Sequence, residues 1–272
     1  MRVSRITTTL LFLICWTANH CHAGDSPNII LLMGDDHGWD ETGYNGHPHL
    51  KTPVLDQMAT SGLRLDRFYS AHPSCSPTRG SVITGRHPNR YGTFNPGYSL
   101  RPDEISIATL LRKAGYYCAN NSKTDYNFVT AKGEAWNESS RKASWRKRPD
   151  KKAPFFYMQS FAVCHESSLH FPAKLMQSEK TKTPANQVNL HPYHPDTPTF
   201  RYTHARYFDR MTVVDAQMGA VLEKLKSDGL LEDTFVFYFG DHGGVLPRAK
   251  GYAYESGLHV PLVVRIPENF KH

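Results

Sequence analysis

Apolar and polar residues follow one another along this chain in blocks that indicate alternating strands and helices. Short apolar runs are typical of strands buried on both faces of a parallel sheet, and they cover residues 28–33, 116–119, 155–163, 235–239 and 261–265. Between them, a 3.6-residue apolar period predicts amphipathic helices over residues 53–62, 105–115 and 202–229. This alternation predicts a layered α/β domain, in which helices flank a central, mostly parallel sheet.

Two long polar stretches interrupt this pattern, at residues 132–152 and 177–198. The first is basic, and the second is rich in Pro, His, Thr and Asn. Neither has the composition of a linker between domains. We expect both to be surface excursions of the kind that often borders the active site in α/β enzymes.

The composition is that of a folded protein, because 39% of the 272 residues are hydrophobic and 21% are charged. The formal net charge is +7, and the basic excess gathers in one short segment. Two interpretations of this basic cluster are open: a solvated surface insertion, or a rim that attracts a polyanionic glycan. No nucleic-acid-binding motif accompanies it, so nucleic acid is not an expected partner. The cluster consists of Arg141, Lys142, Arg146, Lys147, Arg148, Lys151 and Lys152.

The start of the chain has the pattern of a secretory signal peptide, which we predict over residues 1–23. Arg2 and Arg5 precede an apolar stretch at residues 10–16, and a short region ending at Ala23 follows. The apolar stretch is too short for a stable membrane span, and no other segment approaches the necessary length. We therefore expect an exported protein, secreted or periplasmic, in which residues 24–272 form one domain.

Cysteines remain at three positions after the predicted leader: Cys75, Cys118 and Cys164. An odd number in an exported protein indicates that at least one thiol has a separate role. Cys118 and Cys164 could form a disulfide or act as small core residues, and their apolar surroundings favour the core. Cys75 is the candidate for chemistry.

Acidic residues directly follow two of the predicted strands. Asp35 and Asp36 come after the run at 28–33, and Asp241 and His242 come after the run at 235–239. The carboxyl ends of parallel strands meet at one edge of a sheet, where ligands bind in open α/β folds. Carboxylates brought together there would repel one another, and a hard divalent cation relieves that repulsion. We predict a metal site, with Ca²⁺ as the expected ion and Mg²⁺ as the second choice.

The segment from Cys75 to Arg79 reads Cys-Ser-Pro-Thr-Arg and fits the pattern C-x-P-x-R. With the acidic pairs before and after it, the chain resembles a type I sulfatase of the alkaline-phosphatase-like superfamily from residue 27 onward. The resemblance implies that a formylglycine-generating maturation enzyme converts Cys75 into formylglycine, which lies at the metal. The hydrate of that aldehyde then attacks the sulfate ester. Asp35, Asp36, Asp241 and His242 are the implied metal ligands.

Further basic residues fall at positions that the resemblance makes catalytic. Arg79 is expected to hold the formylglycine hydrate, and Lys123 to bind sulfate. His165 and Lys250 are expected to contact the sulfate ester, and they share the role of the acid that protonates the leaving group. The family often carries Lys-x-His at Lys123, whereas this chain has Asp125 at the histidine position, so a histidine contact to the hydrate is not expected.

The resemblance leads us to expect a sulfatase that cleaves sulfate monoesters, on sulfated carbohydrates or other sulfate esters. Two alternatives stay open: a phosphatase or phosphonate monoester hydrolase of the same superfamily, and a truncated relative that binds glycans without turnover. The second arises because family members commonly continue well beyond the position of Val260-Pro261-Leu262, into a C-terminal subdomain that we expect to be absent here.

Overall fold

The computed structural model describes residues 26–92, 104–126 and 134–271; the predicted signal peptide, residues 1–23, lies outside them. A seven-stranded sheet with the order β2-β7-β6-β1-β5-β3-β4 runs through the described part of the chain. Its strands are β1 (Asn28–Gly34), β2 (Leu63–Leu65), β3 (Tyr117–Asn121), β4 (Glu138–Ser139), β5 (Phe155–Phe161), β6 (Thr234–Gly240) and β7 (Leu262–Arg265). The strands from β6 to β4 are mutually parallel, while β7 is antiparallel to both β6 and β2.

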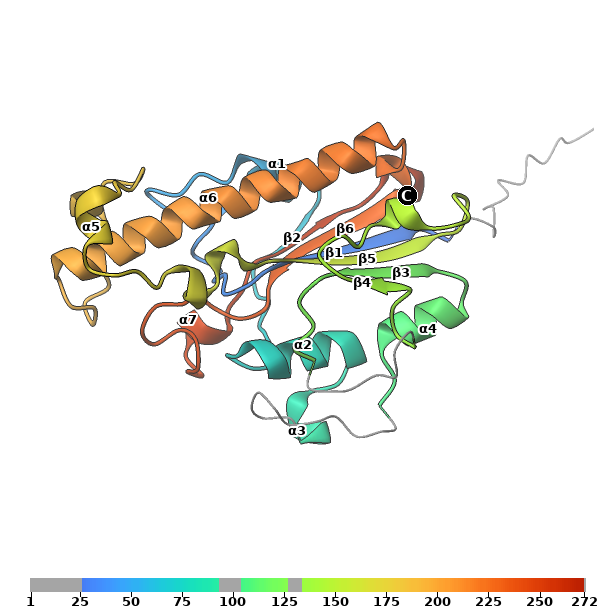
Figure 1. Cartoon of the computed structure of the whole chain (residues 1–272), viewed down its shortest axis with the longest axis horizontal. Coiled ribbons are helices and arrows are strands. Elements are labelled where there is room, and N and C mark those ends of the chain that lie inside the picture. Colours follow the sequence, from blue (N-terminus) through green and yellow to red (C-terminus); the bar gives the residue numbers. More distant parts are fainter. Residues whose placement is uncertain (1–25, 93–103, 127–133, 272) are drawn as a thin grey trace, which may run out of the picture.

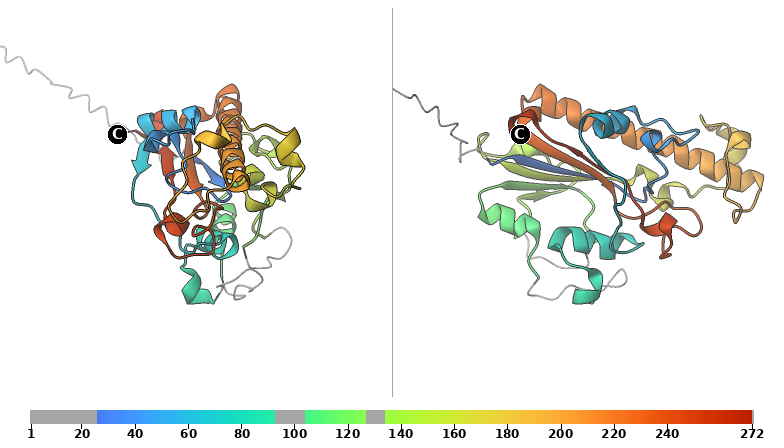
Figure 2. Two further views of the ribbon diagram at one scale, coloured as in Figure 1. Left: turned by 90° about the vertical axis from the view of Figure 1, so that its left-hand side faces the viewer. Right: turned by 180° about the vertical axis from the view of Figure 1, so that it is seen from behind.

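Helices cover both faces of this sheet, which confirms the predicted α/β layers (Figure 1). On one face lie α1 (Pro53–Ser61) and the long α6 (Pro198–Ser227), and on the other lie α2 (Cys75–Thr84), α3 (Pro88–Tyr91) and α4 (Ile107–Lys113). The view from behind in Figure 2 shows the same division. The short helices α5 (Leu175–Ser178) and α7 (Glu255–Leu258) lie beyond the carboxyl ends of the parallel strands.

Each face of the sheet has its own hydrophobic core. Residues such as Ile30, Leu32 and Val236 pack with α1 and α6, whereas Met33 and Phe239 pack with α2 and α4. Because the central strands are buried on both faces, they read as continuous apolar runs, which is why the sequence predicted them.

The structure corrects several predicted boundaries. The predicted strand at 155–163 ends at Phe161, and a 3-10 turn (Ala162–Cys164) follows it. The predicted helix at 202–229 begins earlier, because Pro198 occupies its first turn and the Thr197 side chain accepts a hydrogen bond from the Phe200 amide. Two short edge strands, β2 and β4, were not predicted, since neither contains an apolar run.

The residues of the basic cluster have different surroundings. Arg146 pairs with Asp228, and the Arg148 guanidinium lies 5.2 Å from the Phe155 ring, at the amino end of β5. This part lies near the C-terminus in Figure 1, opposite α7. Only the start of the cluster approaches the other edge, where Asn121 donates to the Arg141 carbonyl at 3.3 Å. For the exposed residues Arg146, Lys147, Lys151 and Lys152, the structure favours the solvated surface insertion over the glycan-attracting rim, whereas Arg148 is buried.

Cys118 and Cys164 do not form a disulfide. Both thiols are free and fully buried, and they belong to different core clusters on opposite faces of the sheet. They act as small core residues, the interpretation that their apolar surroundings favoured.

Candidate functional site

The ends of β1 and β6 bring the predicted metal ligands together. Gly34 and Gly240 are aligned in register, and the amide of Asp241 donates to the Gly34 carbonyl at 3.1 Å. Asp241 Oδ1 in turn accepts from the Asp36 amide at 2.9 Å. A Cβ on Gly240 would overlap the His37 carbonyl oxygen, so this close approach of the two strand ends requires glycine.

Cys75 is the first residue of α2, and its side chain lies beside Asp35 and Asp36. Its Sγ lies 3.2 Å from His242 Nε2, 3.7 Å from Asp36 Oδ1 and 3.8 Å from Asp35 Oδ1. The thiol is 8% exposed, and the carboxylates of Asp35 and Asp36 are at most 1% exposed. The site is therefore a buried cluster of acidic groups with a cysteine at its centre.

Hydrogen bonds from α6 and from the segment after β5 hold the turn that carries Asp35 and Asp36. Asp36 has a φ of 71°, in the left-handed region, which costs a non-glycine residue about 1–2 kcal/mol. The Tyr207 hydroxyl, from α6, donates to the Asp36 carbonyl at 2.7 Å, and the Cys164 thiol donates to the Asp35 carbonyl at 3.0 Å. The Glu166 amide donates to Asp36 Oδ2 at 2.9 Å. These contacts hold both carboxylates toward Cys75.

Two lysines and a histidine form the more exposed wall of the site. Lys123 Nζ donates to the carboxylate of Asp35 at 2.6 and 2.8 Å. Lys250 Nζ donates to the carboxylate of Asp36 at 2.9 and 3.1 Å, and it lies 3.3 Å from His165 Nε2. The lysine side chains are 19% and 17% exposed, so this wall is where the cluster meets solvent.

Arg79 lies beneath the cluster and is fully buried. Its Nη2 donates to Ser160 Oγ at 2.7 Å and to the Lys123 carbonyl at 3.0 Å, while its Nη1 lies 3.8 Å from Asp241 Oδ2. The guanidinium thus ties α2 to β5 and to the loop that carries Lys123. Asp125, at the position where relatives often have histidine, forms a 3.4 Å ion pair with Lys123.

The buried charges alter one another's titration. Burial and the nearby Asp241 raise the pKa of Asp35, and Lys123 opposes them. Burial would also raise the pKa of Asp36, but the hydrogen bond and charge of His242, with Lys250, outweigh it and lower that pKa. Burial raises the pKa of the Cys75 thiol, which therefore stays protonated at neutral pH.

The donor set fits a divalent metal ion. His242 Nδ1 lies 2.8 Å from the Gly243 carbonyl, which can only accept, so Nδ1 carries the hydrogen and Nε2 faces Cys75 and Asp36. A backbone contact of this kind is how metal-binding histidines are commonly oriented. Asp241 Oδ2 is buried and has no hydrogen-bond partner among the described residues. Two groups of side chains could hold an ion here: Asp35, Asp36, Cys75 and His165, and Cys75, Asp241 and His242.

All the site residues predicted from the sequence thus meet at one edge of the sheet, while other contributors were missed. Ser160, Tyr207 and Cys164 each contribute a hydrogen bond that supports the site. Their sequence surroundings carry no signal beyond membership of an apolar strand, helix or turn. His37 is 1% exposed and lies between the Tyr238 hydroxyl and the Glu41 carbonyl. Its contacts stabilise the turn that follows β1.

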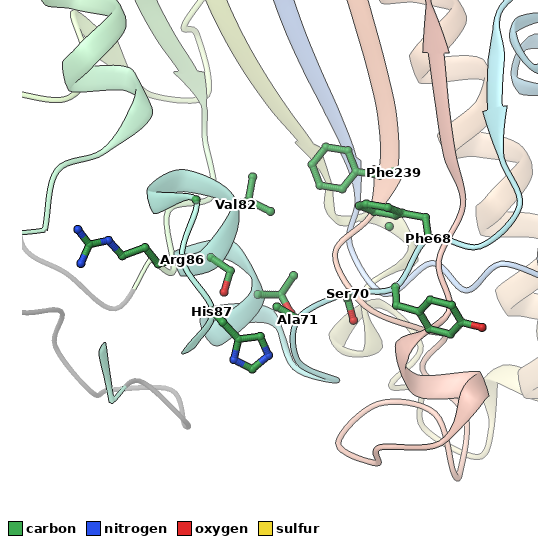
Figure 3. A pocket seen from close by; sticks show the side chains of 12 residues that line it. Phe68, Ser70, Ala71, Val82, Arg86, His87 and Phe239 are labelled. Atoms are coloured by element: carbon green, nitrogen blue, oxygen red, sulfur yellow. The ribbon is translucent and has the colours of Figure 1, made fainter. Parts of the chain in front are cut away.

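A separate cavity of about 320 Å³ lies on another side of α2 (Figure 3). Phe68 and Phe239 form its floor, Val82 its wall, and Arg86 and His87 lie at its rim. It contains none of the predicted site residues, so it is distinct from the cluster around Cys75. No helix in the described part of the chain has both the length and the apolar character to cross a membrane.

Comparison with known proteins relates the chain to sulfatases. The chain is 34% identical over 292 residues to the ulvan-active sulfatase of Formosa agariphila, a match that covers 91% of this chain and 48% of that protein. It is 28% identical to human N-acetylgalactosamine-6-sulfatase, covering 86% of this chain and 53% of the relative. The chain therefore spans about half the length of these curated relatives.

Solved structures share the fold at lower identity. A sulfatase of Pseudoalteromonas sp. gives a TM-score of 0.64 at 21% identity, covering 89% of this chain and 62% of that structure. The phosphonate monoester hydrolase of Agrobacterium radiobacter gives a TM-score of 0.69 at 17% identity, covering 89% and 68%. The model of the family described as Sulfatase matches residues 27–142 and 118–272. This chain belongs to the sulfatase family.

Proposed function

We propose that residues 24–272 form the catalytic domain of a sulfuric ester hydrolase that cleaves sulfate monoesters on carbohydrates. The observation that carries this proposal is the meeting of Cys75 with buried carboxylates on one side and two lysines on the other. Two relatives, the ulvan-active sulfatase and N-acetylgalactosamine-6-sulfatase, are named for sulfated carbohydrates, which supports a sulfated carbohydrate as the substrate.

Asp35, Asp36, Asp241 and His242 would hold Ca²⁺ together with the modified Cys75, with Mg²⁺ as the second choice. Their oxygen-rich donor set suits a hard cation. When bound, such an ion neutralises sulfate oxygens and acidifies a neighbouring hydroxyl. A formylglycine made from Cys75 by a maturation enzyme supplies an aldehyde hydrate as nucleophile, and its second hydroxyl allows sulfate to leave without attack by water on sulfur.

The other residues of the site would bind sulfate, transfer a proton or position these groups. Lys123 and Lys250 present fixed ammonium groups at the open side of the cluster, where they would bind sulfate oxygens. Fixed cations stabilise charge that develops in the transition state without having to reorganise. His165 and Lys250, which lie 3.3 Å apart, can pass a proton to the leaving oxygen, a role that typically contributes about 10²- to 10⁴-fold in rate. Arg79 keeps α2 and the Lys123 loop in place.

Mass spectrometry of the Cys75 peptide, after co-expression with a formylglycine-generating enzyme, tests this proposal. Conversion of the thiol to the aldehyde lowers the peptide mass by about 18 Da, because sulfur and two hydrogens are replaced by one oxygen. The converted protein should hydrolyse 4-nitrophenyl sulfate, lose this activity in EDTA and regain it with Ca²⁺. The Cys75→Ala variant should be inactive at unchanged stability.

Other results of these measurements would favour the alternative functions. A peptide that remains a thiol beside an active maturation enzyme contradicts the catalytic proposal and favours a glycan-binding relative without turnover. A converted protein that prefers phenylphosphonate monoesters to the aryl sulfate would instead be a phosphonate monoester hydrolase. Export of the full-length precursor, with loss of residues 1–23, tests the proposed secreted or periplasmic location.

A further inference from the structure

A second cleft, of about 540 Å³, lies beside the candidate site and contains none of its proposed catalytic or metal-binding residues. Its walls come from segments that also build the site. Asp40 lies in the loop that follows Asp36, Arg248 lies two residues before Lys250, and Tyr193 belongs to the polar excursion at residues 177–198. A hydrogen-bond distance of 3.2 Å between His194 Nε2 and the Pro247 carbonyl joins the last two segments.

Arg248 is held between two aromatic rings. Its guanidinium carbon lies 4.6 Å from the ring centre of Tyr193 and 4.3 Å from that of Tyr254. Contact with ring faces does not use the N–H donors of a guanidinium. Among the described residues, Arg248 has no side-chain ion pair or hydrogen bond, although Asp40 and Glu255 line the same cleft. Its donors are available to an acceptor from outside.

The backbone of Arg248 is also constrained. Its φ is 71°, in the left-handed region, and its carbonyl accepts a hydrogen bond from Ser256 Oγ at 2.8 Å. Residues held in this region of backbone space are concentrated at ligand-binding sites, where a fixed position is worth the strain. Stacking and backbone together fix the direction in which the side chain points.

Aromatic faces make up much of the remaining wall. Trp39 stacks on His259 with ring centres 4.6 Å apart, while Tyr193 and Tyr254 are 41% and 48% exposed. Aromatic rings gathered at the surface around a hollow indicate a binding surface. A sugar presents an apolar C–H face that packs on such rings and hydroxyl groups at its edge. The carboxylates of Asp40 and Glu255 can accept hydrogen bonds from those hydroxyls.

We propose that this cleft binds a sugar residue adjacent to the sulfated one, and that Arg248 pairs with a carboxylate or sulfate group on it. The inference rests on the proposed function, since it names the part of a glycan chain beyond the ester that is cleaved. Two carboxylates beside one arginine disfavour a bare polyanion as ligand, because they would repel it. An acidic sugar satisfies both kinds of group.

Binding and turnover of Arg248→Ala and Tyr254→Ala test this inference, with an ulvan tetrasaccharide and a chondroitin sulfate tetrasaccharide as the probes. The full-length chain with Cys75→Ala allows calorimetric binding to be measured without hydrolysis. We expect each variant to weaken binding of at least one tetrasaccharide by about 10- to 100-fold. In the Cys75-containing enzyme, kcat/KM for that tetrasaccharide should fall similarly, while turnover of 4-nitrophenyl sulfate stays within about twofold.

Arg64→Ala is a matched control, because Arg64 also stacks on a tyrosine, at 5.6 Å from the Tyr44 ring centre, but lies outside the cleft. This variant should leave tetrasaccharide binding unchanged. Absence of tetrasaccharide binding to the Cys75→Ala chain, or binding that is unaffected by either cleft substitution, overturns the inference. So does an equal loss of aryl sulfate turnover in a variant that keeps the wild-type melting temperature, because the substitution would then act on the catalytic site and not on the cleft alone.

The failure of the inference and that of the proposed function can be told apart. Hydrolysis of 4-nitrophenyl sulfate with tetrasaccharide binding that does not depend on Arg248 would leave the sulfatase proposal standing and reject the sugar site. Arg248-dependent binding without any hydrolysis would support the sugar site and reject the sulfatase proposal.

Discussion

At the scale of single residues, the site depends on side chains whose two polar atoms have different roles. His242 uses Nδ1 to hold the Gly243 carbonyl and thereby aims Nε2 at Cys75 and Asp36. Asp241 uses Oδ1 to accept two backbone amides, from Asp36 and from His242 itself, which leaves Oδ2 without a hydrogen bond among the described residues. In each case one atom secures the local fold and the other is available to a ligand.

Asp241→Asn separates these two jobs. The amide oxygen of asparagine can still accept from both backbone amides, so the fold should persist, but the charge on Oδ2 is lost. We expect the Ca²⁺ affinity to fall by about tenfold or more. The measurement is the rise of the melting temperature with added Ca²⁺, which should require a correspondingly higher concentration in the variant. An unchanged Ca²⁺ dependence would show that Asp241 is not a ligand.

The residues that we propose to carry the chemistry were easier to find in the sequence than those that support them. Asp35, Cys75 and Asp241 each stand in a short motif at the end or start of a regular element, so a local pattern reveals them. Ser160 and Tyr207 act through hydrogen bonds to residues far away in sequence. No local pattern can indicate such a partner, because only the packing of α2 and α6 against the sheet creates it.

At the scale of elements, the long helix α6 does more than cover the sheet. Through Tyr207, fully buried in its middle, it reaches the left-handed turn that follows β1 and binds the Asp36 carbonyl. The periodicity of the helix was evident from the sequence. Its role in positioning Asp36 was not, because a tyrosine on an apolar helix face is usually a core residue.

Tyr207→Phe should destabilise the protein, because the buried Asp36 carbonyl loses its hydrogen bond from the hydroxyl. The expected cost is about 1–3 kcal/mol in the free energy of unfolding, measured by urea denaturation. Tyr202→Phe is the matched control on the same helix, since the buried Tyr202 hydroxyl has no partner among the described residues. That variant should be neutral or slightly stabilising. Equal effects of both substitutions would contradict the role assigned to Tyr207.

At the scale of the whole molecule, the central parallel strands and both helical layers could be predicted from apolar periodicity. The short edges could not, since β2 and β4 have only three and two residues. Their place in the sheet is decided by pairing with β7 and β3. The burial of Arg148 within the basic cluster was likewise invisible in the sequence, where these residues form one run.

Buried histidines on α6 and around it make the stability of the whole molecule sensitive to acid. Burial lowers the pKa of His204 from 6.5 to about 4. Between these values the unfolded chain binds more protons, so the contribution of neutral His204 is complete above pH 6.5 and is lost as the pH falls toward 4. We expect the unfolding free energy of the wild-type protein to fall between pH 6.5 and pH 5.

His204→Gln should reduce that fall by up to about 1.5 kcal/mol, because glutamine does not titrate. Its side-chain amide can still donate to the Phe200 carbonyl, which His204 Nδ1 contacts at 3.0 Å. Urea denaturation at the two pH values, in a constant Ca²⁺ concentration, gives the comparison. An equal pH dependence in variant and wild type would show that His204 titrates normally in the folded state.

The burial of Cys75 has a consequence in time. A thiol that is 8% exposed, in the first turn of a packed helix and beneath two lysine-bound carboxylates, cannot lie extended in the active site of another protein. The proposed enzymatic conversion of this side chain would therefore have to precede the docking of α2 onto the sheet. Whether a given molecule carries the modified side chain would then be decided before it has folded. A chain that folded before it met the proposed maturation enzyme would enclose an unmodified cysteine in a finished site, and conversion would then require unfolding.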